Sequence, residues 1–314
     1  MIYTVTDEEI RSYVEGNELV KDFVGCTPEE IKHIIQGWKD VGTILKNKPI
    51  TSPDDYIIDR NTPEAIEFFG SQRTKKYREL VQRNLGSATL FRTGQAPGNM
   101  SITAKCTDPI NVCKKYVYAF VIRGSTKKDG FMGFCPPYFG SQTLPMIIKS
   151  PPLLKEIKLN YSQVSLDIDD WTDNTGSVFL HEMMHLPFIG TPHSDFENHY
   201  NEGLRERGLP KAENFNIKDI RVNNAFLDIK QEGVAYGGTR ARALAYGDTD
   251  GYGTLPFLAC SNADNYALRD LAIFEDHLLR LSVNVIPSAG REYRIGIYSR
   301  QTDIPNGRTK QPKD

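Results

Sequence analysis

Apolar residues recur at helical spacing through the first third of the chain and predict two helices there. Thr27 and Glu30 match the capping box that begins a helix, so the first helix is expected to begin at Thr27 and to fade in the stretch 46–53. The second is expected over residues 63–84, with a weak interval at Gly70-Ser71. The apolar positions of the first helix are Ile31, Ile34, Ile35, Trp38 and Val41. Such stripes predict a helical core.

The middle of the chain changes from helical spacing to strand-like runs. Residues 101–106 and 115–122 are rich in β-branched and aromatic residues, which favour strands. Residues 130–135 are a third predicted strand, which Pro136 and Pro137 end. We expect these three strands to form a small antiparallel sheet.

Two more helices are predicted in the second half, over residues 176–186 and 262–281. Pro187 ends the first of them. The stretch 190–225 is rich in Gly, Pro, Asn and charged residues, and we interpret it as an inserted loop. The fold class is therefore expected to be α+β, mainly helical with a small antiparallel sheet.

Composition and charge are those of a globular protein with a sizeable core. The chain has 314 residues, of which 39% are hydrophobic and 25% charged, and its net charge is −2. This balance implies no general attraction to nucleic acid, and no apolar run is long enough to span a membrane. We expect a monomer with one domain over 26–285, a polar extension over 1–25 and a polar tail over 286–314.

The strongest chemical signal is His181-Glu182-Met183-Met184-His185, inside a predicted helix. Histidines four residues apart lie on one helix face, about one turn apart, so both imidazoles can reach one cation. The pattern H-E-x-x-H is that of a zinc site with its own general base. Zinc lowers the pKa of a bound water toward neutrality, and Glu182 can take that proton. We predict one catalytic Zn²⁺ bound by His181 and His185.

Three segments, in the same order along the chain, resemble the aspzincins, the group of fungal deuterolysin and peptidyl-Lys metalloendopeptidases. They are the H-E-M-M-H helix, Tyr236-Gly237 with Leu244-Ala245 downstream, and Asn262-Ala263-Asp264-Asn265-Tyr266. The order of cysteines and aromatic residues from Cys106 to Phe139 is similar as well. The resemblance covers roughly residues 26–281 and implies a zincin-like metalloendopeptidase.

The resemblance also implies an Asp as third zinc ligand and a Tyr that donates a hydrogen bond to the oxyanion of the reaction. In the family this Asp soon follows the second His, but His193 stands at that position here. We interpret 190–225 as an insertion that splits the motif, so Asp228 is the expected ligand and Tyr236 the expected donor. The alternatives are Asp195 as runner-up, then His193 and His199, with Glu202 and Glu232 lacking the helix pattern of a glutamate ligand.

Asp264 has two interpretations on the sequence. In the family, the N-A-D segment lies near the pocket for the residue after the scissile bond, where a carboxylate would favour Lys or Arg. An Asp in the first turn of a helix is also an ordinary cap. Both interpretations stay open.

The five cysteines indicate an oxidising compartment, because three lie close together in the strand region and none forms a C-x-x-C pair. The family implies the pairs Cys26–Cys106 and Cys113–Cys135, with Cys260 free. The acidic segment 1–9 lacks the apolar core of a signal peptide. We expect a secreted protein whose leader is absent from this sequence.

The expected function is that of a secreted zinc endopeptidase that acts on protein or peptide substrates, with no nucleic-acid or membrane partner. The alternative is a zinc-binding relative with weak catalysis that acts as a binding or effector protein, which the insertion and the polar tail motivate. An oxidoreductase or nucleotide-binding protein finds no support, because no Gly-rich phosphate loop follows a predicted strand.

Overall fold

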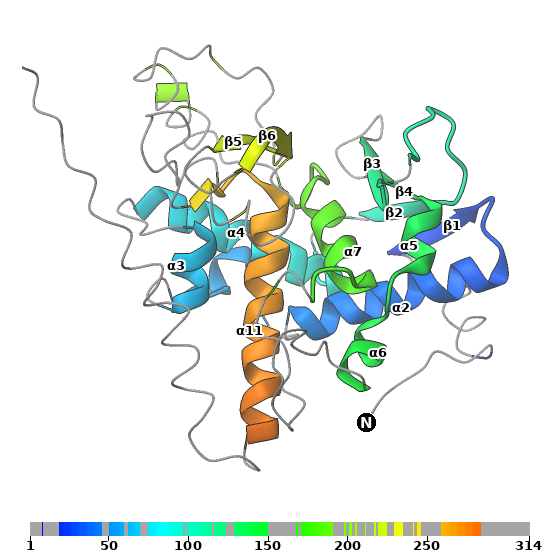
Figure 1. The fold of residues 1–314 in the computed structure, drawn as a ribbon, viewed down its shortest axis with the longest axis horizontal. Helices are drawn as coiled ribbons and strands as arrows, with labels where there is room; N and C mark the ends of the chain where they lie inside the picture. Colours follow the sequence, from blue (N-terminus) through cyan, green and yellow to red (C-terminus); the bar gives the residue numbers. More distant parts are fainter. Residues whose placement is uncertain are drawn as a thin grey trace, which may run out of the picture. The chain divides into compact units, whose positions relative to one another are not determined.

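The computed structural model describes the chain in segments, which form two compact units, Met1–Phe274 and Glu275–Asp314. The described ranges are 19–45, 50–59, 62–69, 75–96, 100–114, 116–123, 129–149, 171–190, 219–224, 229–234 and 259–283, with a few single residues besides. The first unit carries the four-stranded sheet and the helix that contains His181 (Figure 1). Of the second unit, the described part is the end of the last helix.

The helices and strands of the described segments are as follows (Figure 1). The helices are α2 (Pro28–Ile44), η1 (Pro53–Asp55), α3 (Pro63–Phe69), α4 (Lys75–Arg92), α5 (Pro136–Gly140), α6 (Leu144–Lys149), α7 (Thr175–Met184) and α11 (Ala263–Val283). The strands are β1 (Val20–Val24), β2 (Ser101–Lys105), β3 (Ala119–Arg123), β4 (Asp129–Phe134), β5 (Arg221–Asn224) and β6 (Ile229–Val234). The mixture confirms the expected combination of helices with a small sheet; the sheet has four strands, and β5 and β6 form a separate antiparallel pair.

The four-stranded sheet is mixed, so the prediction of an antiparallel sheet is wrong. Its strand order is β1-β2-β4-β3, with β1 and β4 both parallel to β2 and with β3 antiparallel to β4. The successive strands β2 and β3 do run in opposite directions, but β4 lies between them. The sheet also includes β1, which falls within the segment 1–25 that the sequence assigned to an extension.

Two disulfides fasten this sheet and confirm the pairing that the family resemblance implied. Cys26 follows β1 and is bonded to Cys106, which follows β2. Cys113 is bonded to Cys135 at the end of β4. Cys260 is free and buried. Structural disulfides persist in oxidising compartments, so the two bridges support such a location for the chain.

Removing the Cys113–Cys135 bridge is expected to lower the free energy of unfolding by about 3 kcal/mol, because it closes a loop of 22 residues in the unfolded chain. The measurement is urea unfolding of the Cys113→Ala/Cys135→Ala variant under oxidising conditions. Cys260→Ala is the control, since it removes a buried thiol that closes no loop. An unfolding midpoint equal to that of the wild type would contradict the expectation.

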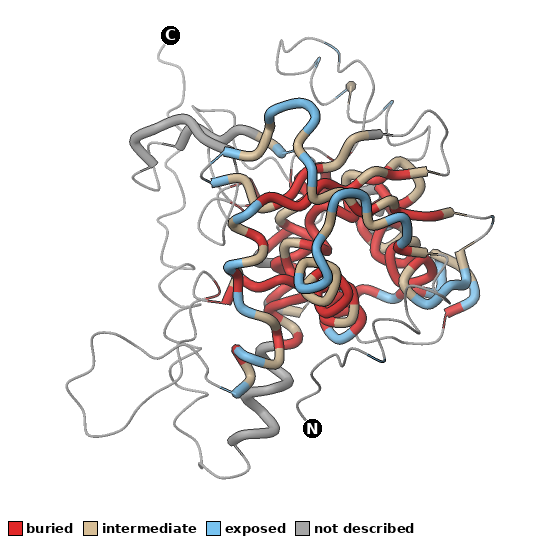
Figure 2. Tube along the Cα trace, turned by 90° about the vertical axis from the view of Figure 1, so that its right-hand side faces the viewer, coloured by how far each residue is buried: buried red, intermediate tan, exposed pale blue. Residues whose placement is uncertain are grey.

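Helix α7 lies between α2 and the sheet (Figure 1). Its Phe179 ring packs against Trp38 of α2 and against Phe134 of β4, with centroids 5.6 Å apart in both pairs. Phe179, Leu180, Met183 and Met184 of α7 are fully buried, and buried segments gather at the centre of the described chain (Figure 2). Packing on both sides fixes the position of α7 along its axis and its rotation about that axis. The direction of its histidines is fixed as a result.

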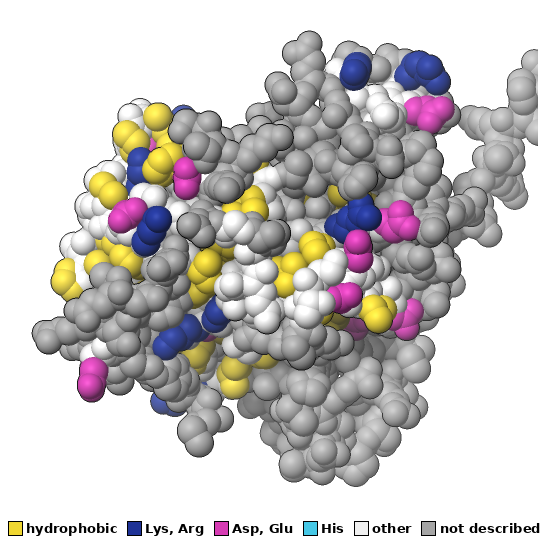
Figure 3. Space-filling model, turned by 180° about the vertical axis from the view of Figure 1, so that it is seen from behind, with side chains coloured by type: hydrophobic (Ala, Val, Ile, Leu, Met, Phe, Trp, Pro, Cys, Tyr) yellow, Lys and Arg dark blue, Asp and Glu magenta, His cyan; other side chains and the backbone are white. Residues whose placement is uncertain are grey.

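The described surface mixes side chains of different chemical kinds. Acidic, basic and apolar side chains are interspersed on the described part of the face shown in Figure 3. Among the described residues, no helix has both the length and the apolar character that a membrane crossing needs.

Asp40 of α2 joins three elements at the start of α7. Its buried carboxylate accepts hydrogen bonds from the Gln36 side chain at 2.7 Å and from the Leu144 N–H and the Thr175 hydroxyl, both at 2.9 Å. Burial raises the pKa of Asp40 from 3.8 to about 6, against the lowering effect of these hydrogen bonds. The carboxyl therefore favours folding most when it is protonated.

The stability of the wild type relative to Asp40→Asn is expected to fall by about 2 kcal/mol between pH 4 and pH 7. A raised carboxyl pKa contributes stability below the unfolded value of 3.8 and loses it as the pH rises through about 6. The Asn variant does not titrate at this position, so the difference between the two proteins isolates Asp40. The measurement is urea unfolding of both at several pH values, and a difference independent of pH would contradict it.

Candidate metal centre

Helix α7 brings its two histidines to one end. Asn174 caps its start, because the Asn174 side chain accepts a hydrogen bond from the Ser177 N–H at 2.9 Å. His181 lies in the last turn and is buried, and His185 is the half-buried C-terminal cap. The predicted helix over 176–186 is thus confirmed, with its end at Met184.

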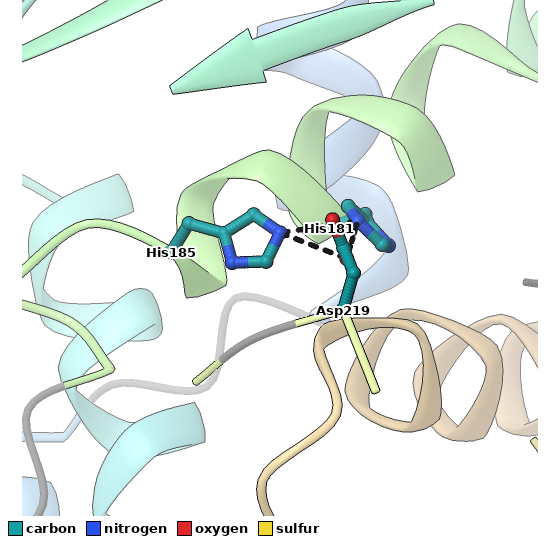
Figure 4. A group of neighbouring side chains, drawn as sticks. All are labelled: His181, His185 and Asp219. Atoms are coloured by element: carbon teal, nitrogen blue, oxygen red, sulfur yellow. Dashed lines mark hydrogen bonds and ion pairs between the residues drawn. The ribbon is translucent and has the colours of Figure 1, made fainter. Parts of the chain in front are cut away.

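Three ligand atoms converge at this end of the helix (Figure 4). The Asp219 carboxylate oxygen Oδ1 is 3.0 Å from Nε2 of His181 and 3.2 Å from Nε2 of His185. The two Nε2 atoms are 3.2 Å apart. Two ligands bound to one zinc ion at about 2.0–2.1 Å in tetrahedral geometry lie about 3.3 Å apart. The three residues can therefore hold a metal ion.

The outer nitrogens of both imidazoles have partners of their own. His181 Nδ1 is 3.0 Å from the Asp264 carboxylate, and His185 Nδ1 is 3.1 Å from the Ile217 carbonyl. A carboxylate and a carbonyl only accept hydrogen bonds, so each Nδ1 carries a proton. A neutral imidazole then has its lone pair on Nε2. Two such lone pairs and a carboxylate oxygen converge on one point, which is an arrangement that calls for a cation.

The pKa shifts of the side chains in the centre also indicate that it favours a cation. Burial works to lower the pKa of His181, but hydrogen bonds to Asp219 and Asp264 outweigh it and raise this pKa well above its usual value. Burial also works to raise the pKa of Asp219, but hydrogen bonds from the two imidazoles hold it well below its usual range. The centre therefore favours positive charge between its side chains, from imidazole protons or from a divalent cation that replaces them.

Glu182 lies beside the centre without belonging to the ligand group. Its carboxylate oxygen is 3.9 Å from Nε2 of His181, and its side chain is buried. Burial raises the pKa of Glu182 above its usual value, while the neighbouring imidazoles partly offset the shift. A carboxylate whose pKa is moved toward neutrality is suited to accept and return a proton.

A pocket of about 200 Å³ opens next to His181 and Glu182. Helix α7 forms one wall, the first turns of α11 another, and the segment before β3 a third. Its described lining includes the carboxylates of Asp173, Glu182 and Asp264 and the rings of Tyr116 and Tyr118, and it contains no Lys or Arg. A substrate group bound here would lie directly beside the proposed metal.

The structure brings together four of the residues that the sequence singled out, namely His181, Glu182, His185 and Asp264. Asp228 and Tyr236 lie outside the described residues, as do His193, Asp195 and His199. Glu202 is described and forms an ion pair with Arg205. Glu232 lies in β6, and its side chain is not among those described.

Asp219 is the residue that the sequence analysis missed. It lies within 190–225, the stretch interpreted as an insertion. Its local signal is the pair Ile217 and Ile220, which lie on either side of it in a segment where apolar and polar residues are mixed, and Ile217 is buried in the structure. A carboxylate that follows a buried anchor residue is fixed in place, which an Asp in an open loop is not.

Comparison with known proteins adds no relative. No protein-family model matches the chain, and no curated protein matches it.

Proposed function

We propose that this chain is a secreted zinc endopeptidase related to the aspzincins, in which His181, His185 and Asp219 hold one Zn²⁺. The observation that carries this proposal is the convergence of two imidazole Nε2 atoms and one carboxylate oxygen, 3.0–3.2 Å apart, at the end of a buried H-E-x-x-H helix. Three protein ligands leave a fourth position for water, as a catalytic zinc site requires.

In the proposed reaction, water adds to the carbonyl carbon of the scissile peptide and the bond to the amide nitrogen breaks. Bound zinc would polarise that carbonyl and make the water more acidic. Glu182 accepts the proton of the water and passes it to the leaving amine, and its raised pKa favours both steps. Tyr236 remains the proposed donor to the oxyanion, by resemblance to the family.

The pocket beside Glu182 supports a substrate of peptide character. It lies between α7 and the segment that leads into the edge strand β3, so a peptide side chain can enter it while the backbone lies at the metal. The two disulfides support secretion, since such bridges persist outside the reducing cytosol.

Digestion of a peptide library by the purified, zinc-loaded protein tests this proposal. We expect cleavage that a chelator abolishes, that added zinc restores, and that His185→Ala lacks. Cleavage that survives the chelator would exclude a zinc peptidase. Tight zinc binding without any cleavage would exclude the enzyme and favour the alternative of a zinc-binding effector.

A further inference from the structure

The segment Asn262–Asp264, at the start of α11, contacts the metal centre at two separate points. Asp264 accepts a hydrogen bond from Nδ1 of His181 at 3.0 Å. The side-chain oxygen of Asn262 accepts a hydrogen bond from the N–H of Ile220 at 2.9 Å, and Ile220 directly follows Asp219. One short segment thus touches both a histidine ligand and the backbone next to the carboxylate ligand.

Asn262 is held so that its oxygen faces Ile220. The side chain is fully buried, and its amide nitrogen donates to the Asn265 side-chain oxygen at 2.7 Å. With the nitrogen directed to Asn265, the side-chain oxygen points the other way and accepts the hydrogen bond from the Ile220 N–H. A buried backbone N–H without such a partner would be costly, so this bond fixes the chain on the C-terminal side of Asp219.

The other side of Asp219 is fixed by a ligand of the same centre. His185 Nδ1 donates to the Ile217 carbonyl at 3.1 Å, and the Ile217 side chain is buried. Asp219 therefore lies on a short stretch whose two ends are held by His185 and by Asn262. Its own side chain is about one-third exposed, so these backbone contacts, more than packing, determine where its carboxylate lies.

Asp264 acts on the other ligand. Its carboxylate is mostly buried, and it fixes the ring of His181 with the protonated Nδ1 outward and Nε2 toward Asp219. Carboxylate partners of this kind raise the basicity of a metal-binding imidazole and set its orientation. Asn265, buried in the same turn of α11, donates to the carbonyls of Phe68 and Ala241 and so anchors the turn.

We propose that Asn262 and Asp264 are positioning residues of the metal centre, with Asp264 orienting His181 and Asn262 holding the backbone beside Asp219. This assigns to Asp264 a role that neither a helix cap nor a substrate subsite supplies. The inference rests on the proposed metal site but not on the proposed peptide hydrolysis.

Zinc affinity, measured by competition with a chromophoric chelator, tests the role of Asp264. Asp264→Ala is expected to bind zinc about 10- to 100-fold more weakly than the wild type. Asp264→Asn keeps an acceptor oxygen and is expected to lose less. Asp173→Asn is the matched control, because Asp173 lines the same pocket and its bond to the Ser141 hydroxyl leads away from the ligands. The visible spectrum of the Co²⁺-loaded protein is expected to change in Asp264→Ala and not in the control.

Two results would overturn the role of Asp264. One is a zinc affinity equal to that of the wild type in both Asp264 variants. If the cleavage preference of these variants changed at the same time, Asp264 would belong to the substrate pocket instead. The other is a loss of affinity matched by Asp173→Asn, which would reflect only the charge of the pocket. A wild type that binds no zinc would instead refute the proposed metal site itself.

A double-mutant cycle tests Asn262. Asn262→Ala is expected to weaken zinc binding about tenfold in the wild type and to have no further effect in Asp219→Ala, because it acts through the carboxylate of Asp219. Asp264→Ala is expected to keep its effect in the same background, since it acts through His181. An equal loss from Asn262→Ala in both backgrounds would show a general structural role and overturn the proposal for this residue.

Discussion

Replacing Glu182 by Gln is expected to leave zinc bound and to lower the rate of peptide hydrolysis by a factor of about 10² to 10⁴, the range that a general base contributes. Glu182 lies outside the group of ligand atoms, and its closest oxygen is 3.9 Å from Nε2 of His181. Gln has nearly the same shape but cannot accept a proton, so the change removes the base and keeps the packing. Metal analysis and kcat/KM on one peptide substrate measure the two effects.

Glu29→Gln is the matched control for this prediction. Glu29 is an exposed residue in the first turn of α2. Its change to Gln also removes one carboxylate, but one that has no part in the proposed reaction. It is expected to leave both zinc content and cleavage as they are. Zinc lost from Glu182→Gln would make Glu182 a ligand instead of a base, and cleavage at the wild-type rate would remove it from the reaction.

Local patterns in the sequence predicted the starts of the helices better than their ends, since the second predicted helix was to end at residue 84 and α4 continues to Arg92. Thr27 and Glu30 form the expected capping box at the start of α2, with both hydrogen bonds of the box present. The helices α3 and α4 lie on either side of the weak interval at Gly70-Ser71, which itself falls outside the described residues. In each case the signal and the structure involve residues within one or two turns of each other, where sequence spacing determines contact.

The sheet could not be predicted in the same way, because strand order depends on contacts between distant segments. Three strands were expected in the right places, but β4 lies between β2 and β3, and β1 joins the sheet from a segment assigned to an extension. Pro136 and Pro137 were interpreted as the end of a strand, and they also begin the short helix α5. Pro is favoured at the first helical positions, so one signal served both elements.

In the metal centre, too, contacts between neighbouring residues could be predicted and contacts between distant segments could not. The pair His181 and His185 follows from helical spacing alone. His181 and Asp264 are 83 residues apart, and His185 and Ile217 are 32 apart, so only the folded chain shows that they meet. The disulfide pairs were correct because the family resemblance supplied them, which spacing alone does not do.

The sequence and the structure lead to different hypotheses for the third ligand of the metal. The sequence favoured Asp228, which precedes Tyr236-Gly237 as the family's Asp precedes its Tyr-Gly. The structure instead gives Asp219 a carboxylate oxygen 3.0 and 3.2 Å from the two imidazoles. Hydrogen bonds at Ile217 and Ile220 hold the chain on both sides of it. We therefore propose Asp219 as the ligand.

Asp219→Ala is expected to weaken zinc binding by more than about 100-fold, beyond the range seen for residues that only orient a ligand. The variant loses one of three protein ligands and leaves the two imidazole nitrogens without their anionic partner. Peptide cleavage at ordinary zinc concentrations is expected to fall with it. His185→Ala provides the reference for the loss of a ligand, and chelator competition measures all variants on one scale.

Asp228→Ala and Asp195→Ala complete the test, and both are expected to bind zinc as the wild type does. If Asp228→Ala loses zinc and Asp219→Ala keeps it, the sequence hypothesis of a motif split by an insertion holds and the contact of Asp219 with the imidazoles is not a metal bond. If only Asp219→Ala loses zinc, the stretch 190–225 is no mere insertion, because it carries the ligand that completes the centre. The aspartate would then reach the metal from a segment held by Asn262 and His185, so the ligand is placed by contacts that sequence spacing does not record.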